Sequence, residues 1–160
     1  MAKKLVAYFS VKGTTAARAK QVAQAAGAEL YEIRPTVPYT SADLDWRNRQ
    51  SRCSKEMNDP DCRPPVEGKV AQMDAYDVVF VGFPIWWGVE PRIVDTFLES
   101  YDFSGKAIVP FATSGGSGIE YATAHLHSAC PHIQEWRAGK LLNDSDFRKI
   151  AAWVEELGLD

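Results

Sequence analysis

The sequence predicts an α/β protein, a three-layer doubly wound sandwich in which a five-stranded parallel sheet is covered by helices on both faces. Three observations support this class. Short apolar runs alternate with helix-forming stretches, the runs at 76–82 and 107–112 are almost continuously apolar, and polar, glycine-containing loops follow several strands. Continuous apolar runs are typical of strands buried on both faces of a parallel sheet. Ligands of such sheets bind at the carboxyl ends of the strands.

The first third of the chain has the order of a βαβ unit. Residues 5–9 form a short apolar run rich in strand formers, and residues 16–26 are mostly strong helix formers. Gly27 is placed to end this helix, because glycine favours the left-handed conformation of a helix C-terminus. Residues 28–33 alternate loosely and are predicted to form the second strand.

Residues 36–75 break this alternation, and we expect them to form a long excursion from the sheet. A helix is predicted over 41–56, with Ser41 as its N-cap and Asp43 in its first turn. Trp46 and Met57 argue against disorder in this segment. Long, partly irregular segments inside a compact domain are usually functional or disordered, so the excursion is expected to pack near a site.

The second half of the chain resumes the alternation. Pro91 is placed at the start of a helix, where its fixed φ is favourable. The predicted elements are strands at 76–82 and 107–112, a helix from Pro91, a helix after 113–118 that ends near Ala129, a last strand within 132–142 broken near Gly139, and a C-terminal helix over 145–157 capped by Asn143 or Asp144.

Length and charge limit the classes of function. A chain of 160 residues is predicted to be a single domain, 1–160. Its net charge is −3 and its basic residues are scattered, so no nucleic-acid-binding face is expected. The longest apolar run, 78–89, is interrupted by glycine and proline and is too short to span a membrane. The apolar stretch at 5–9 is too short for a signal peptide, so a cytoplasmic location is expected.

The cysteines and histidines indicate no metal site. Cys53, Cys62 and Cys130 contain no CxxC pair and are expected to be free thiols, with a Cys53–Cys62 disulfide as the alternative. His125 and His127 are two positions apart, so on a helix they point to different sides and make a poor metal pair. They are expected to be solvated or bonded to a partner.

The first candidate binding loop, residues 10–15, suits a phosphate group. A helix N-terminus presents unpaired backbone N–H groups and a partial positive charge. The hydroxyls of Ser10, Thr14 and Thr15 can add donors, and Gly13 allows close approach of the backbone. The loop has neither the dinucleotide glycine fingerprint nor the Gly-Lys-Thr ending of a P-loop. A capped helix start with a turn glycine is the structural alternative.

The second candidate loop contains two adjacent tryptophans at a strand end. Its binding residues are predicted to be Pro84, Ile85, Trp86, Trp87 and Gly88. A large planar partner would explain the pair, because aromatic rings stack and an indole N–H can bond to a polar rim. Burial of both rings in the core is the alternative.

The third candidate loop, 113–118, holds three glycines and three hydroxyl residues. It is either a flexible connection or a loop whose free N–H groups line the polar edge of a ligand. The predicted contacts are Thr113, Ser114, Gly115, Gly116 and Gly118. All three loops follow strands of one parallel sheet and should meet at one edge. Together they suit a planar heterocycle that carries a terminal phosphate.

These motifs resemble the flavodoxin family, and in particular bacterial flavodoxin-like proteins with an Ile-Trp-Trp-Gly loop. The resemblance extends over nearly the whole chain. The matching segments are residues 6–10 with 13–15, then 43–46, 51–52 and 56–60, then 82–88, 100–106 and 110–117. The Trp-Trp-Gly and Thr-Ser-Gly-Gly-Ser motifs are fairly specific when they occur together.

The resemblance implies a flavodoxin-like strand order 2-1-3-4-5 and a tightly held, non-covalent FMN. The FMN phosphate would lie on Ser10, Gly13, Thr14 and Thr15, and the isoalloxazine between the 84–88 and 113–118 loops. Lys12 departs from the family pattern, which usually has a small hydroxyl or amide residue there. Its ammonium would either favour a dianionic phosphate or point to water.

Two classes of function remain. An electron shuttle between redox partner proteins needs no catalytic side chain, because the flavin carries the chemistry. An oxidoreductase would use NAD(P)H to reduce a quinone or similar small acceptor, under a roof formed by the excursion. The net charge of −3 is modest for the acidic docking face that the resemblance implies for a shuttle. A third reading is an interaction domain without flavin. Both a monomer and a homodimer remain possible.

The excursion also contains a cluster of arginines that bears on this choice. The cluster could meet a phosphorylated nicotinamide cofactor, or it could be a solvated face with salt bridges to nearby acids. Its members are Arg47, Arg49, Arg52 and Arg63.

Overall fold

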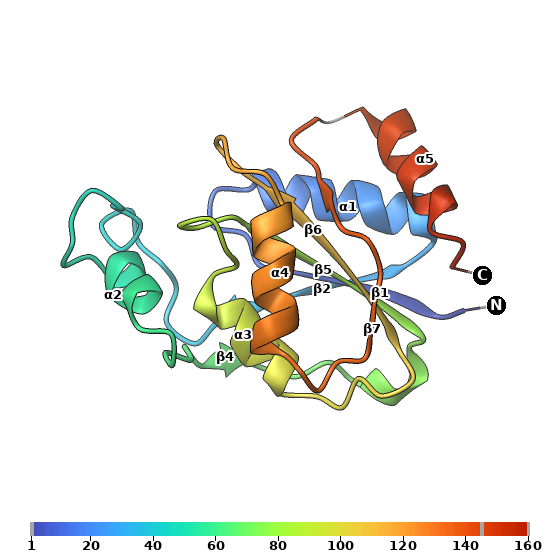
Figure 1. The fold of residues 1–160 in the computed structure, drawn as a ribbon, viewed down its shortest axis with the longest axis horizontal. Helices are drawn as coiled ribbons and strands as arrows, with labels where there is room; N and C mark the ends of the chain where they lie inside the picture. The colour runs from blue at the N-terminus through green and yellow to red at the C-terminus, as the bar shows by residue number, and fades with distance from the viewer. Residues whose placement is uncertain (1, 145, 160) are drawn as a thin grey trace.

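A parallel sheet forms the centre of the molecule (Figure 1). The computed structural model describes residues 2–144 and 146–159. The strands run in the order β2-β1-β5-β6-β7, with β8 beside β6, and all of these pairings are parallel. This confirms the three-layer α/β class and the predicted order. The strands are β1 (Lys4–Tyr8), β2 (Glu29–Glu32), β5 (Val78–Pro84), β6 (Ala107–Thr113), β7 (Glu135–Trp136) and β8 (Lys140–Leu141).

The sheet has six strands instead of the expected five because its last strand is split. β7 pairs with the start of β6 at Ala107 and Ile108, whereas β8 pairs further along, at Phe111 and Ala112. The chain passes close to Pro110 in between. A Cβ atom on Gly139 would lie 2.7 Å from the Pro110 carbonyl oxygen, so this approach requires glycine.

Helices cover both faces of the sheet (Figure 1). α1 (Thr14–Ala26) and α5 (Phe147–Glu156) pack on one side, and α3 (Arg92–Glu99) and α4 (Glu120–Ala129) on the other. Each face has its own apolar core, in which alternate residues of the buried strands point to opposite sides. Gly82 is required in β5, because a Cβ there would lie 2.2 Å from the Phe111 ring.

The helix ends differ slightly from the expected positions. α1 begins at Thr14 instead of residue 16, so both threonines of the first loop belong to its first turn. Gly27 ends α1 in the left-handed conformation, as expected. The cap of α5 is Asp146, whose side chain accepts a hydrogen bond from the Arg148 N–H, and not Asn143 or Asp144. Residue 145, the predicted first position of that helix, lies outside the described residues.

The helix predicted over 41–56 is wrong in its first half. Residues 41–50 form turns, and α2 spans only Arg52–Asn58, with Ser51 instead of Ser41 as its N-cap. The side chains of Asp45 and Asn48 accept hydrogen bonds from backbone N–H groups two residues ahead. Such local bonds compete with helix formation.

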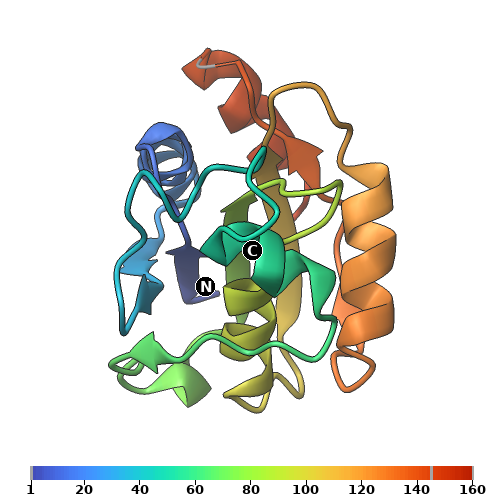
Figure 2. The ribbon, with the colours of Figure 1, turned by 90° about the vertical axis from the view of Figure 1, so that its left-hand side faces the viewer.

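The remaining elements of the excursion are short, and an antiparallel strand pair joins its two ends. β3 (Arg34–Pro35) and β4 (Val66–Glu67) form an antiparallel pair, and a 3-10 helix, η1 (Met73–Ala75), leads into β5. The two views agree that α2 lies beyond the carboxyl ends of the central strands (Figures 1 and 2). The excursion is therefore beside the loops that follow those strands. Within the described chain, no helix is long and apolar enough to cross a bilayer.

Candidate functional site

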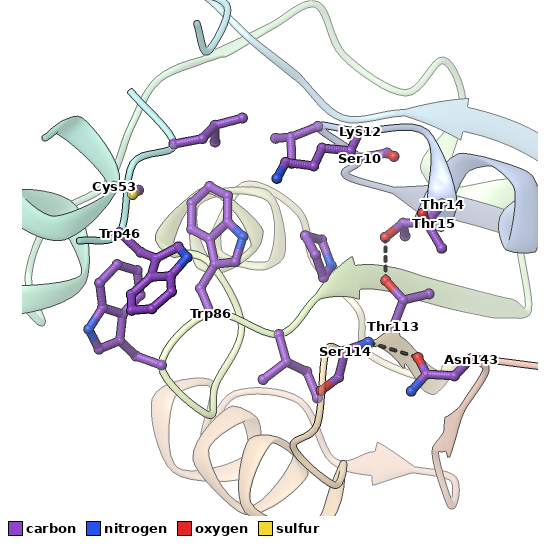
Figure 3. A pocket seen from close by; sticks show the side chains of 16 residues that line it. Ser10, Lys12, Thr14, Thr15, Trp46, Cys53, Trp86, Thr113, Ser114 and Asn143 are labelled. Atoms are coloured by element: carbon purple, nitrogen blue, oxygen red, sulfur yellow. Dashed lines mark hydrogen bonds between the residues drawn. The ribbon is translucent and has the colours of Figure 1, made fainter. Parts of the chain in front are cut away.

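The three candidate loops meet at one cavity of about 480 Å³ at the carboxyl edge of the sheet (Figure 3). Eleven of the fifteen predicted binding residues line it, whereas Gly13, Gly88, Gly116 and Gly118 do not. The lining residues are Ser10, Val11, Lys12, Thr14, Thr15, Leu44, Trp46, Cys53, Pro84, Ile85, Trp86, Trp87, Thr113, Ser114, Gly115 and Asn143.

The first loop forms an anion-receptive end of the cavity. The Ser10 hydroxyl accepts hydrogen bonds from the N–H groups of Gly13 (3.2 Å) and Ala16 (3.1 Å), so it holds the loop in shape. Gly13 adopts a positive φ of 93° at the start of α1. Within the described chain, the N–H groups of Thr14 and Thr15 donate to no protein acceptor. These two donors and the Lys12 ammonium favour a negatively charged group here.

The second loop is a tight hairpin. Trp86 and Val89 exchange both backbone hydrogen bonds, at 2.9 and 3.1 Å. The two central residues, Trp87 (φ 52°) and Gly88 (φ 82°), are both left-handed, as a type I′ turn requires. Gly88 does not line the cavity, but it makes this turn possible. A Cβ on it would lie 3.3 Å from the Tyr121 ring of α4.

The adjacent tryptophans have different environments. Trp86 is half-buried and packs edge-on against Phe9 and Tyr39, with ring centroids 5.7 and 5.6 Å apart. Trp87 is 48% exposed. The core-burial alternative therefore applies in part to Trp86 and not to Trp87. Both rings line the cavity and provide apolar, planar surface for a ligand.

In the third loop, side-chain oxygens accept hydrogen bonds from three of the backbone N–H groups. The Ser114 hydroxyl accepts from the N–H groups of Gly116 (3.0 Å) and Ser117 (2.6 Å). The Ser114 N–H donates to the Asn143 amide oxygen at 2.8 Å (Figure 3). The expectation of a flexible loop with free N–H groups is wrong for these three amides, because side chains that follow the strand ends satisfy them.

The excursion contributes one wall of the cavity, through Leu44, Trp46 and Cys53. Arg92 fastens this wall to α3, because its guanidinium donates to the carbonyls of Glu56 (3.3 Å) and Met57 (2.9 Å) near the end of α2. The Met57 carbonyl is one that a helix C-terminus leaves without an intrahelical partner, whereas the Glu56 carbonyl also accepts the Asp59 N–H at 3.2 Å. The excursion is thus an ordered part of the site, consistent with the expectation that it packs near one.

A second set of contacts joins the excursion to Trp86. The Tyr39 hydroxyl donates to the Glu56 carboxylate at 2.5 Å, and Arg52 lies over the Tyr39 ring, 3.7 Å from its centroid. Burial and the Glu56 contact raise the pKa of the Tyr39 phenol, so it stays protonated as the donor. Because Tyr39 also packs on Trp86, this cluster sets the position of the indole.

The arginine cluster divides into two pairs. Arg52 and Arg63 form ion pairs with Glu56 (2.9 Å) and Glu99 (3.0 Å), as the salt-bridge alternative expected. Arg47 and Arg49 are exposed and form no ion pair within the described chain. They lie beside Trp46 and Trp87, at the outer end of the site.

Sequence reasoning missed Val11, Leu44, Cys53 and Asn143 as lining residues and used Trp46 only as evidence of order. Trp46 gave a usable signal, because a tryptophan in an irregular polar segment needs an apolar neighbour or a ligand. Asn143 gave none, because its place beside Ser114 depends on the path of the chain after β8. Cys53, Cys62 and Cys130 are free thiols, as expected.

The fold and this site define an open, doubly wound α/β protein with a ligand cavity at the carboxyl edge of its sheet. Comparison with known proteins gives the particular family. The flavodoxin family model matches residues 3–157, and the chain belongs to the flavodoxin family.

Solved structures agree with this assignment. A candidate flavoprotein from Bacteroides eggerthii is 49% identical over 100% of both chains, with a TM-score of 0.96. One from Bacteroides uniformis is 47% identical over 96% of this chain and 98% of its own, with a TM-score of 0.93. A Lactobacillus acidophilus flavoprotein in complex with FMN shares the fold at 20% identity, with a TM-score of 0.76 and coverage of 94% and 99%. No curated protein has a matching sequence.

Proposed function

We propose that the protein binds FMN non-covalently in this cavity and transfers electrons through it. The observation that carries the proposal is that one cavity combines the anion-receptive start of α1 with a wall formed by the indoles of Trp86 and Trp87. The volume of about 480 Å³ is within the roughly 300–1,000 Å³ typical of small-molecule sites. The flavodoxin family and the FMN complex of the Lactobacillus acidophilus relative support the same ligand.

The chain's residues fit the two ends of FMN. The N–H groups of Thr14 and Thr15, together with the Thr14 hydroxyl and Lys12, would hold the phosphate. The ring system would lie between the hairpin loop, residues 84–88, and the start of the 113–118 loop. Gly13, Gly88, Gly116 and Gly118 would shape these loops without lining the cavity. FMN supplies one- and two-electron redox chemistry when bound.

A second candidate is an FMN-dependent oxidoreductase that uses NAD(P)H to reduce a quinone or similar small acceptor. The observation that favours it is the unpaired cations Arg47 and Arg49 at the outer end of the site. For the shuttle, the partner would be a redox protein. Cytoplasmic location and a monomeric or homodimeric state are proposed with either candidate.

The first experiment is to purify the protein and record its visible spectrum. We expect a yellow protein with flavin bands in the blue and near-ultraviolet that survive desalting. Apoprotein should recover these bands when FMN is added. A colourless protein that takes up no added FMN would overturn the proposal and would favour an interaction domain.

A second experiment separates the two candidates. FMN-loaded protein is mixed anaerobically with NADH and, separately, with NADPH, and the blue band is followed. Rapid bleaching by either nucleotide alone identifies the oxidoreductase. Bleaching that requires an added flavoprotein reductase identifies the shuttle.

A further inference from the structure

A second cavity, of about 620 Å³, adjoins the candidate flavin site. Trp46 and Trp87 line both cavities, so the two spaces share a wall formed by the indoles. We call the second space the outer cavity. It is lined by Trp46, Arg47, Arg49, Ser54, Asn58 and Trp87.

The lining of the outer cavity is cationic. It contains two guanidinium groups and no carboxylate. Neither Arg47 nor Arg49 forms an ion pair within the described chain, whereas Arg52 and Arg63 in the same excursion do. The nearby Asp45 carboxylate accepts a hydrogen bond from the Arg47 backbone N–H at 3.2 Å and forms no ion pair with its guanidinium. The positive charge here is therefore available to a ligand.

The same cavity offers flat apolar surface. Trp46 is 65% exposed and Trp87 is 48% exposed, which is unusual for a residue whose ring normally buries a large area. The Arg47 guanidinium lies 5.2 Å from the centroid of the Trp46 ring. Asn58 of α2 supplies an exposed polar side chain to the lining, whereas the Ser54 hydroxyl is buried and donates to the Asn48 carbonyl at 2.8 Å. Exposed aromatic rings beside unpaired arginines are a recognition surface for a ring that carries a negative charge.

We propose that the outer cavity binds a small planar aromatic anion, a ring system that carries a carboxylate or sulfonate group. Its ring packs on Trp46 and Trp87, and its anionic group pairs with Arg47 and Arg49. The inference deepens the proposed flavin function and rests on it, because such a ligand would lie next to the bound FMN. A recess lined by two indoles fits a flat ring better than the broad surface of a protein partner, which typically covers roughly 800 Å² on each side.

The test is calorimetric titration of the FMN-loaded protein with 2-naphthoate and with its neutral analogue, 2-naphthamide. We expect 2-naphthoate to bind about tenfold more tightly, because only the carboxylate pairs with the arginines. R47Q and R49Q should each weaken 2-naphthoate binding about 3- to 5-fold, the range of an exposed ion pair, and leave 2-naphthamide binding unchanged. W46A should weaken both ligands, because both rings use the same stacking surface.

The matched control is K20Q, which removes an exposed cation from α1, away from this cavity. It should change the affinity for neither ligand. Equal affinities for the two ligands, no effect of R47Q and R49Q, or no binding of 2-naphthoate to yellow, FMN-loaded protein would each overturn the inference. Loss of FMN binding is recorded separately by absorbance and overturns the proposed function. The titration of that colourless protein would still decide whether the outer cavity selects the anion.

Discussion

The hydroxyl oxygens of Thr15 and Thr113 share a buried hydrogen bond of 2.8 Å, although the two residues are 98 positions apart in the chain. Thr15 lies in the first turn of α1, and Thr113 is the last residue of β6. The bond therefore joins the first candidate loop to the third. Thr14, one position earlier, lines the same cavity and is exposed.

This arrangement predicts different roles for the two threonines. T15V should lower the free energy of unfolding by about 1–2 kcal/mol, because it leaves the buried Thr113 hydroxyl without its partner. T14A should leave stability unchanged and should weaken FMN binding about 3- to 10-fold without weakening riboflavin binding. Denaturant unfolding and ligand titration measure the two effects. Equal loss of both ligands in T14A would mean that the phosphate lies elsewhere.

Gly88 of the hairpin is predicted to affect the one-electron potential of bound FMN. G88A introduces a side chain at φ 82°, which costs about 1–2 kcal/mol for a non-glycine residue, and its Cβ would press on Tyr121. Because the Trp87–Gly88 peptide lies beside the proposed ring site, the substitution should also shift the one-electron potential of bound FMN, by about 40 mV for each kcal/mol.

G105A is the matched control for this prediction. Gly105 also has a positive φ of 74°, and a Cβ there would meet nothing within 4 Å. Its substitution should lower stability by a similar amount and leave the potential of bound FMN unchanged. Spectroelectrochemical titration of both variants compares them. The same potential in G88A and in the unsubstituted protein would argue against a role for this peptide.

Trp87 is predicted to lower the stability of the apoprotein while its ring contributes to FMN binding. An indole at φ 52° is strained, whereas asparagine is preferred before glycine in a type I′ turn. W87N should raise the free energy of unfolding of the apoprotein by about 0.5–1 kcal/mol, by relief of backbone strain. It should also weaken FMN binding, since the ring no longer lines the cavity. W46N, at an exposed position without positive φ, should bring no gain in stability; an equal gain would show that backbone strain is not the cause.

A buried carboxyl group on α3 is predicted to make stability depend on pH. Asp95 is 1% exposed and has one oxygen without a hydrogen-bond partner within the described chain. Burial, then the hydrogen bond and charge of the equally buried Glu90, raise its pKa to about 9, against the opposing charges of Arg63 and His125. Glu90 in turn lies 2.9 Å from the His125 Nδ1 atom, so His125 has a protein partner, as expected.

The sign of the effect follows from the raised pKa. Between pH 4 and pH 9 the folded state holds the Asp95 proton and the unfolded state loses it, so stability falls as the pH rises through this window. D95N should remove this slope. As the pH rises through the window, the free energy of unfolding of D95N minus that of the unsubstituted protein should increase by up to about 1.4 kcal/mol per pH unit. The control is D61N, at an exposed carboxylate; a constant difference for D95N across the pH range would contradict the prediction.

The meeting of the three loops could be predicted from local signals. Each loop follows directly on a strand, and parallel strands end at the same edge of a sheet. The excursion could not be predicted in this way. The sequence favours a helix over 41–56, but the side chains of Asp45 and Asn48 accept backbone hydrogen bonds that favour turns instead. The position of α2 depends on Arg92, more than thirty residues ahead in the chain.

The amino-acid pattern alone was sufficient for the α/β class, the order of elements and eleven cavity-lining residues, because these depend on periodicity and on strand ends. The folded chain was needed to assign Ser10 and Ser114 to holding their own loops, to split the arginines into paired and unpaired groups, and to bring Trp46 and Asn143 to the cavity. These features arise from contacts between distant segments, whose geometry no local pattern encodes.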